Sequence, residues 1–305
     1  MATVQFSCRV PNADYLGFEA TPEAITAVAV RAEELGFDAI LLNDHLIVDG
    51  SPRSAPWANT FDPLITLSYL AARTTRIRLG TSVLIMPYRN PIATAKQLAT
   101  LDQLSGGRVI AGVGAGWSEA ESDALGVPFR ERGARTTEYL RVWQACWGAD
   151  PVSFRGRFFS FTDMRARPKP RQEPHPPIWI GGGSDGALRR TAEFAQIWQP
   201  MQMSLAELGS RQSALQQACQ QIGRADVPPT RMSVRVGFRD VADVPGSGER
   251  PLGQGRVDQV VEDFRRLRSA GLDQFQINFM GCRSLSHLLE SMALFMREVS
   301  PAVSA

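Results

Sequence analysis

Three consecutive polar residues, Asn43-Asp44-His45, directly follow the apolar run Asp38–Leu42, which has the composition of a buried strand. When parallel strands form a barrel, residues at their carboxyl ends face the active site. A histidine in that position can donate a hydrogen bond or transfer a proton near neutral pH. The alternative is structural, with Asp44 capping a turn and His45 only packing against its neighbours.

Two further segments place small residues where a ligand could approach the backbone. The run Gly80-Thr81-Ser82-Val83-Leu84 lies inside a predicted strand, where small residues permit close approach or a bulge. The alternating glycines of Gly112-Val113-Gly114-Ala115-Gly116-Trp117 come just past another strand and would expose backbone N–H groups. The structural alternatives are a bulged strand in the first case and the start of a flexible loop in the second.

The segment Gly181-Gly182-Gly183-Ser184 is the strongest candidate for a phosphate site, because a predicted helix begins at Asp185. The free N–H groups and the dipole at a helix N-terminus favour an anion, and the Ser184 hydroxyl could add a hydrogen bond. A late barrel strand is also where barrels commonly bind phosphate. The alternative is a plain glycine turn with Ser184 as the N-cap of the helix.

Other kinds of catalytic site find little support in the sequence. His45, His175 and His287 lie on separate segments without HExxH or Cys/His spacing, so we expect no metal site, and we interpret His175 as part of a proline-rich structural turn. The chain also lacks a GxSxG elbow and a Walker loop. With so few acids and nucleophiles expected to point inward, we predict that a cofactor supplies the chemistry.

Eight strand–helix units would position these residues. The predicted strands are Val4–Val10, Asp38–Leu42, Ile77–Leu84, Arg108–Val113, Pro177–Gly181, Gln196–Gln199, Met232–Phe238 and Gln274–Phe279. The predicted helices are Pro22–Leu35, Pro63–Arg73, Pro91–Leu104, Arg132–Trp147, Asp185–Phe194, Leu205–Ile222, Arg256–Ala270 and Leu285–Val299. The first of them has Thr21 as its N-cap and ends at Gly36.

Repeated βα units imply a parallel sheet, because each strand needs a crossover helix to return. We expect a single (β/α)₈ TIM barrel domain over residues 1–305 rather than an open doubly wound sheet, since no GxGxxG turn follows the first strand. Long insertion loops at the C-terminal face are predicted at 47–61, 115–131 and 239–255. The segment 151–176 precedes the fifth strand, and Ser153–Phe161 within it alternates like a hairpin.

Composition limits the choice of partners. The 33 basic and 31 acidic residues nearly balance, so nucleic acid and anionic membranes are not expected partners. The four cysteines lack CxxC spacing and are expected to be reduced and mostly buried. With neither a signal peptide nor a membrane span evident in the sequence, we expect a cytoplasmic enzyme that acts on a small molecule.

Taken in order, these segments resemble the bacterial luciferase-like monooxygenase family, and within it the branch that depends on the deazaflavin coenzyme F420. Any one of the matching segments is unspecific, but together they cover most of the chain. They are Glu34-Leu35-Gly36-Phe37-Asp38, Asp44-His45-Leu46, Thr75-Arg76-Ile77-Arg78-Leu79-Gly80-Thr81-Ser82-Val83, Leu101-Asp102-Gln103-Leu104-Ser105-Gly106-Gly107-Arg108, Gly112–Trp117, Pro174-His175-Pro176-Pro177-Ile178-Trp179-Ile180-Gly181-Gly182 and Gly186-Ala187-Leu188-Arg189-Arg190.

The resemblance implies a role for each candidate residue. A bulge with a non-proline cis peptide, here Ser82-Val83, would back the cofactor ring, and His45 would contact its reactive region. Gly114, Ala115, Gly116 and Trp117 would line the ring and tail, while Gly182, Gly183 and Ser184 would hold the phosphate. We also place Asp44 and Thr81 among the cofactor-binding residues. The resemblance further implies a homodimer.

The sequence departs from part of this family at Trp117, where the sugar-phosphate dehydrogenases carry a glutamate acid. We therefore expect a pocket lined by apolar or aromatic groups, to which Trp57, Trp117 and Trp198 could contribute, although some of these could be core or interface residues. The leading hypothesis is hydride transfer between coenzyme F420 and a small organic substrate. The alternative is an FMN-dependent monooxygenase that receives reduced FMN from a separate flavin reductase and activates oxygen. A third hypothesis is a barrel without a cofactor, or a flavin-binding protein without catalytic activity.

Overall fold

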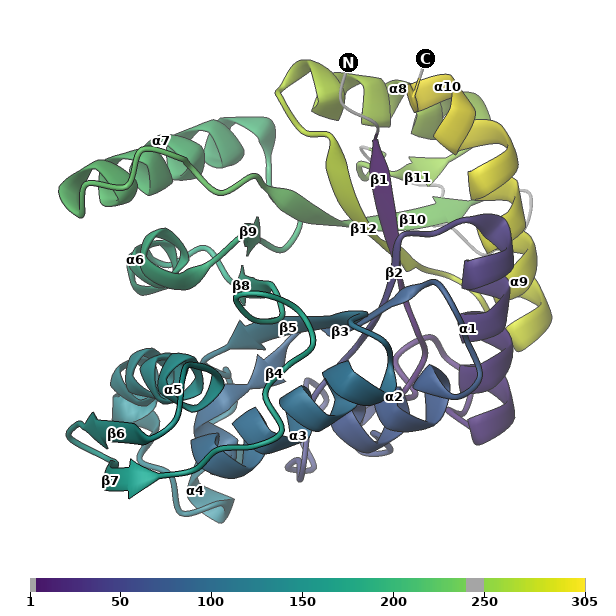
Figure 1. Cartoon of the computed structure of the whole chain (residues 1–305). Coiled ribbons are helices and arrows are strands. Elements are labelled where there is room, and N and C mark those ends of the chain that lie inside the picture. The colour runs from purple at the N-terminus through teal and green to yellow at the C-terminus, as the bar shows by residue number, and fades with distance from the viewer. Residues whose placement is uncertain (1–3, 240–249, 305) are drawn as a thin grey trace.

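The computed structural model describes residues 4–239 and 250–304. In these residues eight parallel strands form the barrel, surrounded by helices (Figure 1). The barrel strands are β1 (Gln5–Arg9), β2 (Ala39–Leu42), β3 (Arg78–Thr81), β5 (Val109–Gly114), β8 (Ile178–Gly181), β9 (Ile197–Gln199), β10 (Arg231–Phe238) and β12 (Gln274–Phe279). All of their carboxyl ends lie at one face, because every pairing between them is parallel.

The sheet runs in the order β10-β12-β1-β2-β3-β5-β8-β9, and backbone contacts between its two ends close it. Trp198 in β9 forms a parallel bridge with Thr230, the residue before β10. The Trp198 amide donates to Pro229 O at 3.0 Å, and the Ser233 amide donates to Pro200 O at 3.0 Å. These bonds confirm the predicted barrel and exclude an open sheet.

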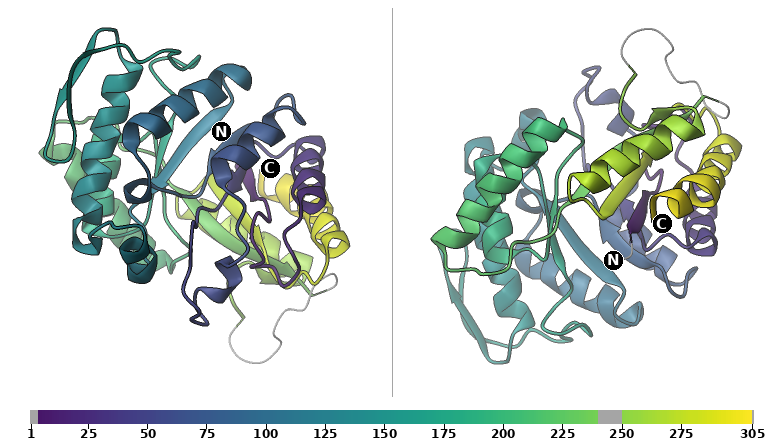
Figure 2. Two further views of the ribbon diagram at one scale, coloured as in Figure 1. Left: turned by 90° about the horizontal axis from the view of Figure 1, so that it is seen from below. Right: turned by 90° about the horizontal axis from the view of Figure 1, so that it is seen from above.

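The helices follow the predicted pattern closely, and Figure 2 shows two further views of them around the strands. Their bounds are α1 (Pro22–Leu35), α2 (Pro63–Ala71), α3 (Pro91–Leu104), α4 (Glu119–Ala124), α5 (Arg132–Trp147), α6 (Asp185–Phe194), α7 (Leu205–Gln221), α8 (Val257–Ser269), α9 (Leu285–Leu294) and α10 (Ser300–Ser304). Thr21, Asp62 and Asn90 each cap a helix that has proline at its start, and Gly36 ends α1 with φ of 85°.

Two predicted elements are interrupted in the structure. The strand expected over Ile77–Leu84 divides into β3 and the short strand β4 (Leu84–Ile85), which pairs with β5. The break lies at Ser82-Val83, whose peptide bond is cis. The helix expected over Leu285–Val299 ends at Leu294, and a π-helical turn, Phe295–Val299, leads into α10.

The insertions add structure outside the barrel. The strands β6 (Val152–Arg155) and β7 (Ser160–Met164) form the predicted antiparallel hairpin, which lies beside α5 (Figure 1). The loop 115–131 contains α4 and a 3₁₀ turn, Phe129–Glu131. From the last insertion, residues 240–249 lie outside the described part, and the rest includes β11 (Gln254–Gly255), paired with β10.

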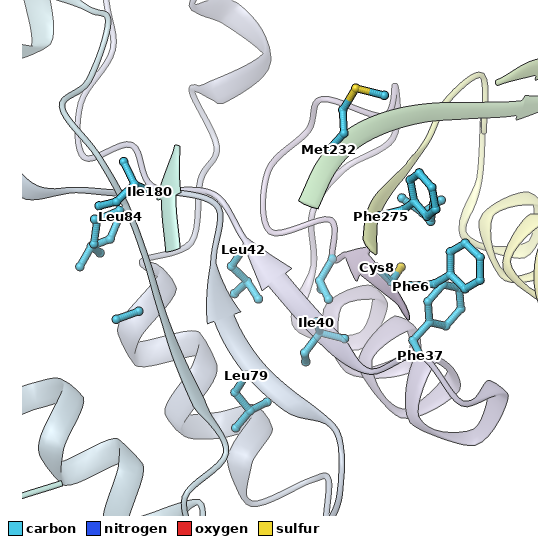
Figure 3. Close-up of a cluster of buried hydrophobic side chains, with 14 of the residues drawn as sticks. Phe6, Cys8, Phe37, Ile40, Leu42, Leu79, Leu84, Ile180, Met232 and Phe275 are labelled. Carbon is cyan, nitrogen blue, oxygen red and sulfur yellow. The ribbon is translucent and has the colours of Figure 1, made fainter. Parts of the chain in front are cut away.

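The main hydrophobic core lies between the strands and the helices. Figure 3 shows part of it, where Phe6 and Phe275 from adjacent strands stack with ring centroids 5.7 Å apart. Ile40 and Leu42 belong to this core, whereas the alternate residues Ala39 and Leu41 belong to a second, smaller cluster. All four cysteines are buried and unpaired, as predicted.

An arginine fills the N-terminal end of the barrel interior. The side chain of Arg231, the first residue of β10, is 1% exposed and lies over the Trp179 ring at 4.7 Å. It forms an ion pair with Asp38 at 2.9 Å and donates to Gln5 and Gln274, the first residues of β1 and β12. This cluster closes one end of the barrel, so a ligand must enter from the other.

Candidate active site

A cavity of about 710 Å³ opens at the C-terminal ends of the strands. Ten of the twelve site residues predicted from the sequence line it: Asp44, His45, Ser82, Val83, Gly114, Ala115, Gly116, Trp117, Gly182 and Ser184. The other two do not. Thr81 is buried and donates to Gly112 O at 2.6 Å, and Gly183 lies outside the lining.

His45 lies in the wall of this cavity and is held by a carboxylate that the sequence analysis did not identify. Its Nδ1 is 2.9 Å from Glu121 Oε2. Glu121 is 1% exposed, and its Oε1 accepts from the Leu46 amide at 2.7 Å and the Ile47 amide at 3.3 Å. A carboxylate partner keeps a proton on Nδ1, so Nε2 is the nitrogen left for a ligand.

The same contacts determine the charge of Glu121. Burial raises its pKa, but the hydrogen bonds from His45 and from the Leu46 amide outweigh burial, and the net pKa lies below the ordinary value. The predicted insertion loop 115–131 gave no sign of Glu121, because the residue is placed by the short helix α4 within that loop. The pattern Ser118-x-x-Glu121 could have revealed the short helix α4, since Ser118 Oγ accepts from the Glu121 amide at 3.2 Å.

Two tryptophans from different insertions hold the imidazole ring. Trp57 stacks on His45 with centroids 5.2 Å apart, and Trp117 meets it edge-on at 5.6 Å. Arg53 lies over the Trp117 ring at 4.1 Å, which adds a cation–π contact at the mouth of the cavity. The expected aromatic lining is therefore present at Trp57 and Trp117.

Asp44 is one of the residues that line the cavity, and its carboxylate is held by other protein groups. Its Oδ2 accepts from the Ile85 amide at 2.8 Å, and Oδ1 accepts from Arg89 at 2.6 Å. These bonds tie β2 to the chain beyond the cis peptide. The Asp44 side chain therefore makes long-range contacts in place of a local turn cap.

Glycines leave room for the Val83 side chain at the floor of the cavity. A Cβ atom on Gly114 would lie 2.5 Å from Val83 Cγ2, and one on Gly181 would lie 2.6 Å from Val83 Cγ1. Such contacts are closer than carbon atoms tolerate. β5 and β8 must therefore carry glycine here for Val83 to occupy its position.

We predict that Gly114→Ala displaces Val83 and weakens cofactor binding at least tenfold, because the added methyl group would collide with this cavity-lining side chain. The matched control is Gly209→Ala in α7, where the added methyl meets nothing within 4 Å. That control should bind cofactor normally and be slightly more stable, since alanine favours a helix. Normal affinity in Gly114→Ala would contradict this account of the floor.

The glycine turn before α6 has the geometry expected of an anion site. Gly182 has φ of 95°, a conformation that favours glycine, and Ser184 caps the helix by accepting from the Ala187 amide at 3.3 Å. Trp198 supports the turn from beneath, with Nε1 donating to Gly182 O at 2.8 Å. Trp198 is fully buried and does not line the cavity, so of the two alternatives for this residue the core position holds.

Three arginines line the cavity along with this turn: Arg130, Arg132 and Arg190. Arg132 donates to Phe129 O at 2.9 Å and Arg190 to Gly133 O at 3.4 Å, both neutral acceptors. In the described residues none of the three forms an ion pair with a carboxylate. Burial lowers the pKa of Arg190, and the neighbouring Arg189 and Arg132 lower it further. This end of the cavity is therefore positively charged.

The deep side of the cavity is polar. Gln276 Oε1 accepts from Ser82 Oγ at 2.8 Å and from Gln199 Nε2 at 2.7 Å. Three buried atoms of lining residues have no hydrogen-bond partner among the described residues: Arg9 Nε, Asn43 Nδ2 and Gln199 Oε1. Buried polar groups in native proteins are normally satisfied, so these atoms favour a polar ligand in the cavity.

Other kinds of site are absent from the described residues. There, no group of three histidine, cysteine, aspartate or glutamate side chains could hold a metal ion. His175 lies away from the cavity, with Nδ1 2.8 Å from Pro176 O and its ring against Trp147. None of the helices in residues 4–239 and 250–304 combines the length and apolarity needed to cross a membrane.

Comparison with known proteins gives relatives of two chemical types. The chain is 36% identical over 169 residues to an F420-dependent glucose-6-phosphate dehydrogenase of Amycolatopsis mediterranei, covering 53% of this chain and 48% of the relative. It is 40% identical over 138 residues to an FMNH₂-dependent dimethylsulfone monooxygenase of Pseudomonas putida, covering 44% and 38%. The chain thus spans half or less of the length of these two curated relatives.

Solved structures share the fold at lower identity. An F420-dependent secondary alcohol dehydrogenase in complex with an F420-acetone adduct superposes with a TM-score of 0.80 at 18% identity, covering 99% of both chains. A family model described as luciferase-like monooxygenase matches residues 3–240. Because that match spans most of the chain, this protein belongs to the luciferase-like monooxygenase family.

Proposed function

We propose that this protein is an F420-dependent oxidoreductase that acts on a small organic substrate. The observation that carries the choice of cofactor is the group Arg130, Arg132 and Arg190 beside the glycine turn, without carboxylate partners in the described residues. FMN ends in one phosphate, whereas the tail of F420 carries a phosphodiester followed by carboxylates. Three guanidinium groups suit the longer anionic tail better.

The cavity residues fit this group. Gly114, Gly116 and Gly182 line the cavity without side chains and would let a flat ring and its tail lie close to the strand ends, with Val83 behind the ring. The α6 N-terminus and Ser184 would hold the phosphate. When bound, the deazaflavin would accept or donate a hydride.

His45 would manage the accompanying proton. Glu121 keeps Nδ1 protonated, so Nε2 can accept a proton from a substrate hydroxyl during oxidation, or return one to a carbonyl during reduction. Trp57 and Trp117 fix the ring plane and shield it from water. Dimer formation and a cytoplasmic location remain expectations drawn from the sequence.

The second candidate is an FMN-dependent monooxygenase supplied by a flavin reductase, and its support is the dimethylsulfone monooxygenase among the relatives. The two candidates share the fold, so cofactor preference must separate them.

The test is an anaerobic titration of the purified protein with F420 and with reduced FMN, in which isothermal calorimetry measures the two dissociation constants. We expect F420 to bind at least tenfold more tightly, and Gly182→Val to abolish that binding, because valine disfavours φ of 95°. Preference for reduced FMN, together with substrate-dependent oxygen consumption, would establish the monooxygenase instead. Unchanged F420 affinity in Gly182→Val would remove the phosphate assignment.

A further inference from the structure

Arg9, the last residue of β1, is a cavity-lining cation without an acidic partner. Its Nη2 donates to Ser82 O at 3.2 Å, and its guanidinium lies 5.6 Å from the centre of the Tyr15 ring. Its Nε is buried without a partner. Among the described residues no carboxylate forms an ion pair with it, although a buried charge normally requires one.

A second arginine lies two strands away, across β12. The strand β12 lies between β1 and β10, and the register that pairs Cys8 with Ile277 places Arg9 beside Asn278. Arg235 of β10 pairs directly with Asn278 from the other side. Arg235 follows Ser233, a cavity-lining residue, by two positions, so both belong to the same face of the strand.

Neither arginine is neutralised within the described protein. Arg235 is exposed, and no side-chain hydrogen bond or ion pair accounts for its charge. Burial lowers the pKa of Arg9, Tyr15 opposes that shift, and Arg235 adds to it. The two positive charges repel each other across β12, so an anion bound between them would lower that repulsion and would give Arg9 the counter-charge it lacks.

We propose that Arg9, which lines the cavity, and Arg235, at its exposed rim, bind an anionic group of the substrate, such as a carboxylate or a phosphate. This inference rests on the proposed function, because it assigns this side of the cavity to the substrate. The Ser82 carbonyl fixes Arg9 beside the cis peptide, and the glycine turn with its three arginines serves the cofactor tail. The substrate is thus an organic acid or an ester of phosphoric acid.

The experiment compares acids with their uncharged amides, using benzoate with benzamide and hexanoate with hexanamide. Dissociation constants are measured by ligand-observed NMR at constant ionic strength, with and without F420. We expect at least one acid to bind tenfold or more tightly than its amide, because charge-assisted hydrogen bonds to guanidinium are strong. That preference should disappear in Arg9→Gln and fall several-fold in Arg235→Gln.

The matched control is Arg76→Gln, an exposed arginine before β3 at the opposite end of the barrel, which should keep the full preference. Arg235 is exposed, so its variant reports on the site even where Arg9→Gln fails to fold. Equal binding of acids and amides by the wild type overturns the proposal. An acid preference that survives in both variants also overturns it. Variants that lose only F420 affinity would overturn it as well, because Arg9 would then lie against the cofactor.

The two proposals fail separately. An acid preference that depends on Arg9, in a protein that binds no F420, would remove the proposed function and leave the anion site. F420 binding without any acid preference would support the proposed function and overturn the anion site.

Discussion

Replacing Glu121 with alanine is expected to lower kcat about 10- to 100-fold, the usual cost of removing a residue that orients a functional histidine. Glu121 holds Nδ1 of His45 and accepts from two backbone amides, so its loss frees the ring and leaves those amides unsatisfied. The neighbouring Glu119→Ala, exposed on the same helix α4, should retain full activity.

A readout independent of turnover makes the test specific. The chain has three histidines, so nitrogen-15 NMR can follow His45 directly in the wild type and the variant. We expect wild-type His45 to be protonated on Nδ1 and Glu121→Gln to move the proton to Nε2, because an amide nitrogen would then face Nδ1. An unchanged tautomer in Glu121→Gln, together with unchanged kcat, would show that Glu121 only accepts hydrogen bonds from the Leu46 and Ile47 amides and does not orient His45.

The lowered pKa of Glu121 also predicts an acid effect. A carboxylate whose folded pKa is depressed stabilises the folded site above its unfolded pKa of about 4.3, and that contribution is lost as the pH falls toward the folded pKa. The wild type should therefore lose stability below about pH 4.3 more steeply than Glu121→Gln.

The largest expected effect on stability comes from Asp38→Ala, which should lower the free energy of unfolding by about 3–5 kcal/mol. Asp38 is the carboxylate that pairs with Arg231, whose side chain is 1% exposed in the barrel interior. Without it, the guanidinium remains buried with only Gln5 and Gln274 as acceptors. Urea unfolding followed by circular dichroism measures the loss.

Two controls distinguish the cost of leaving Arg231 buried and unpaired from the cost of losing an ion pair in general. Glu34→Ala removes an exposed pair with Arg31 and should cost less than about 1 kcal/mol. The double variant Asp38→Ala with Arg231→Met should be more stable than Asp38→Ala alone, because no unpaired charge is left behind. A double variant that is the less stable of the two would show that Arg231 stabilises the barrel without Asp38.

Local sequence rules predicted the helices and strands well because their determinants are local. Thr21 with Pro22, Asp62 with Pro63 and Asn90 with Pro91 provide both the cap and a proline suited to the first helical turn. The cis peptide at Ser82-Val83, implied by the family resemblance, is also present. The expected bulge at that bond is in the structure a full break between β3 and β4, and α4 was not predicted.

The sequence by itself determined the strand–helix alternation, the barrel and the glycine-rich segments around the cavity, because periodicity, capping and backbone freedom depend on neighbouring residues. Tertiary structure alone decided which side chains meet across the barrel. It brought Glu121 to His45 from 76 positions away, placed Trp198 under the glycine turn instead of in the cavity, and set Arg9 and Arg235 on either side of β12 with no carboxylate partner among the described residues. Such contacts depend on strand order and register, which join residues that no local pattern connects.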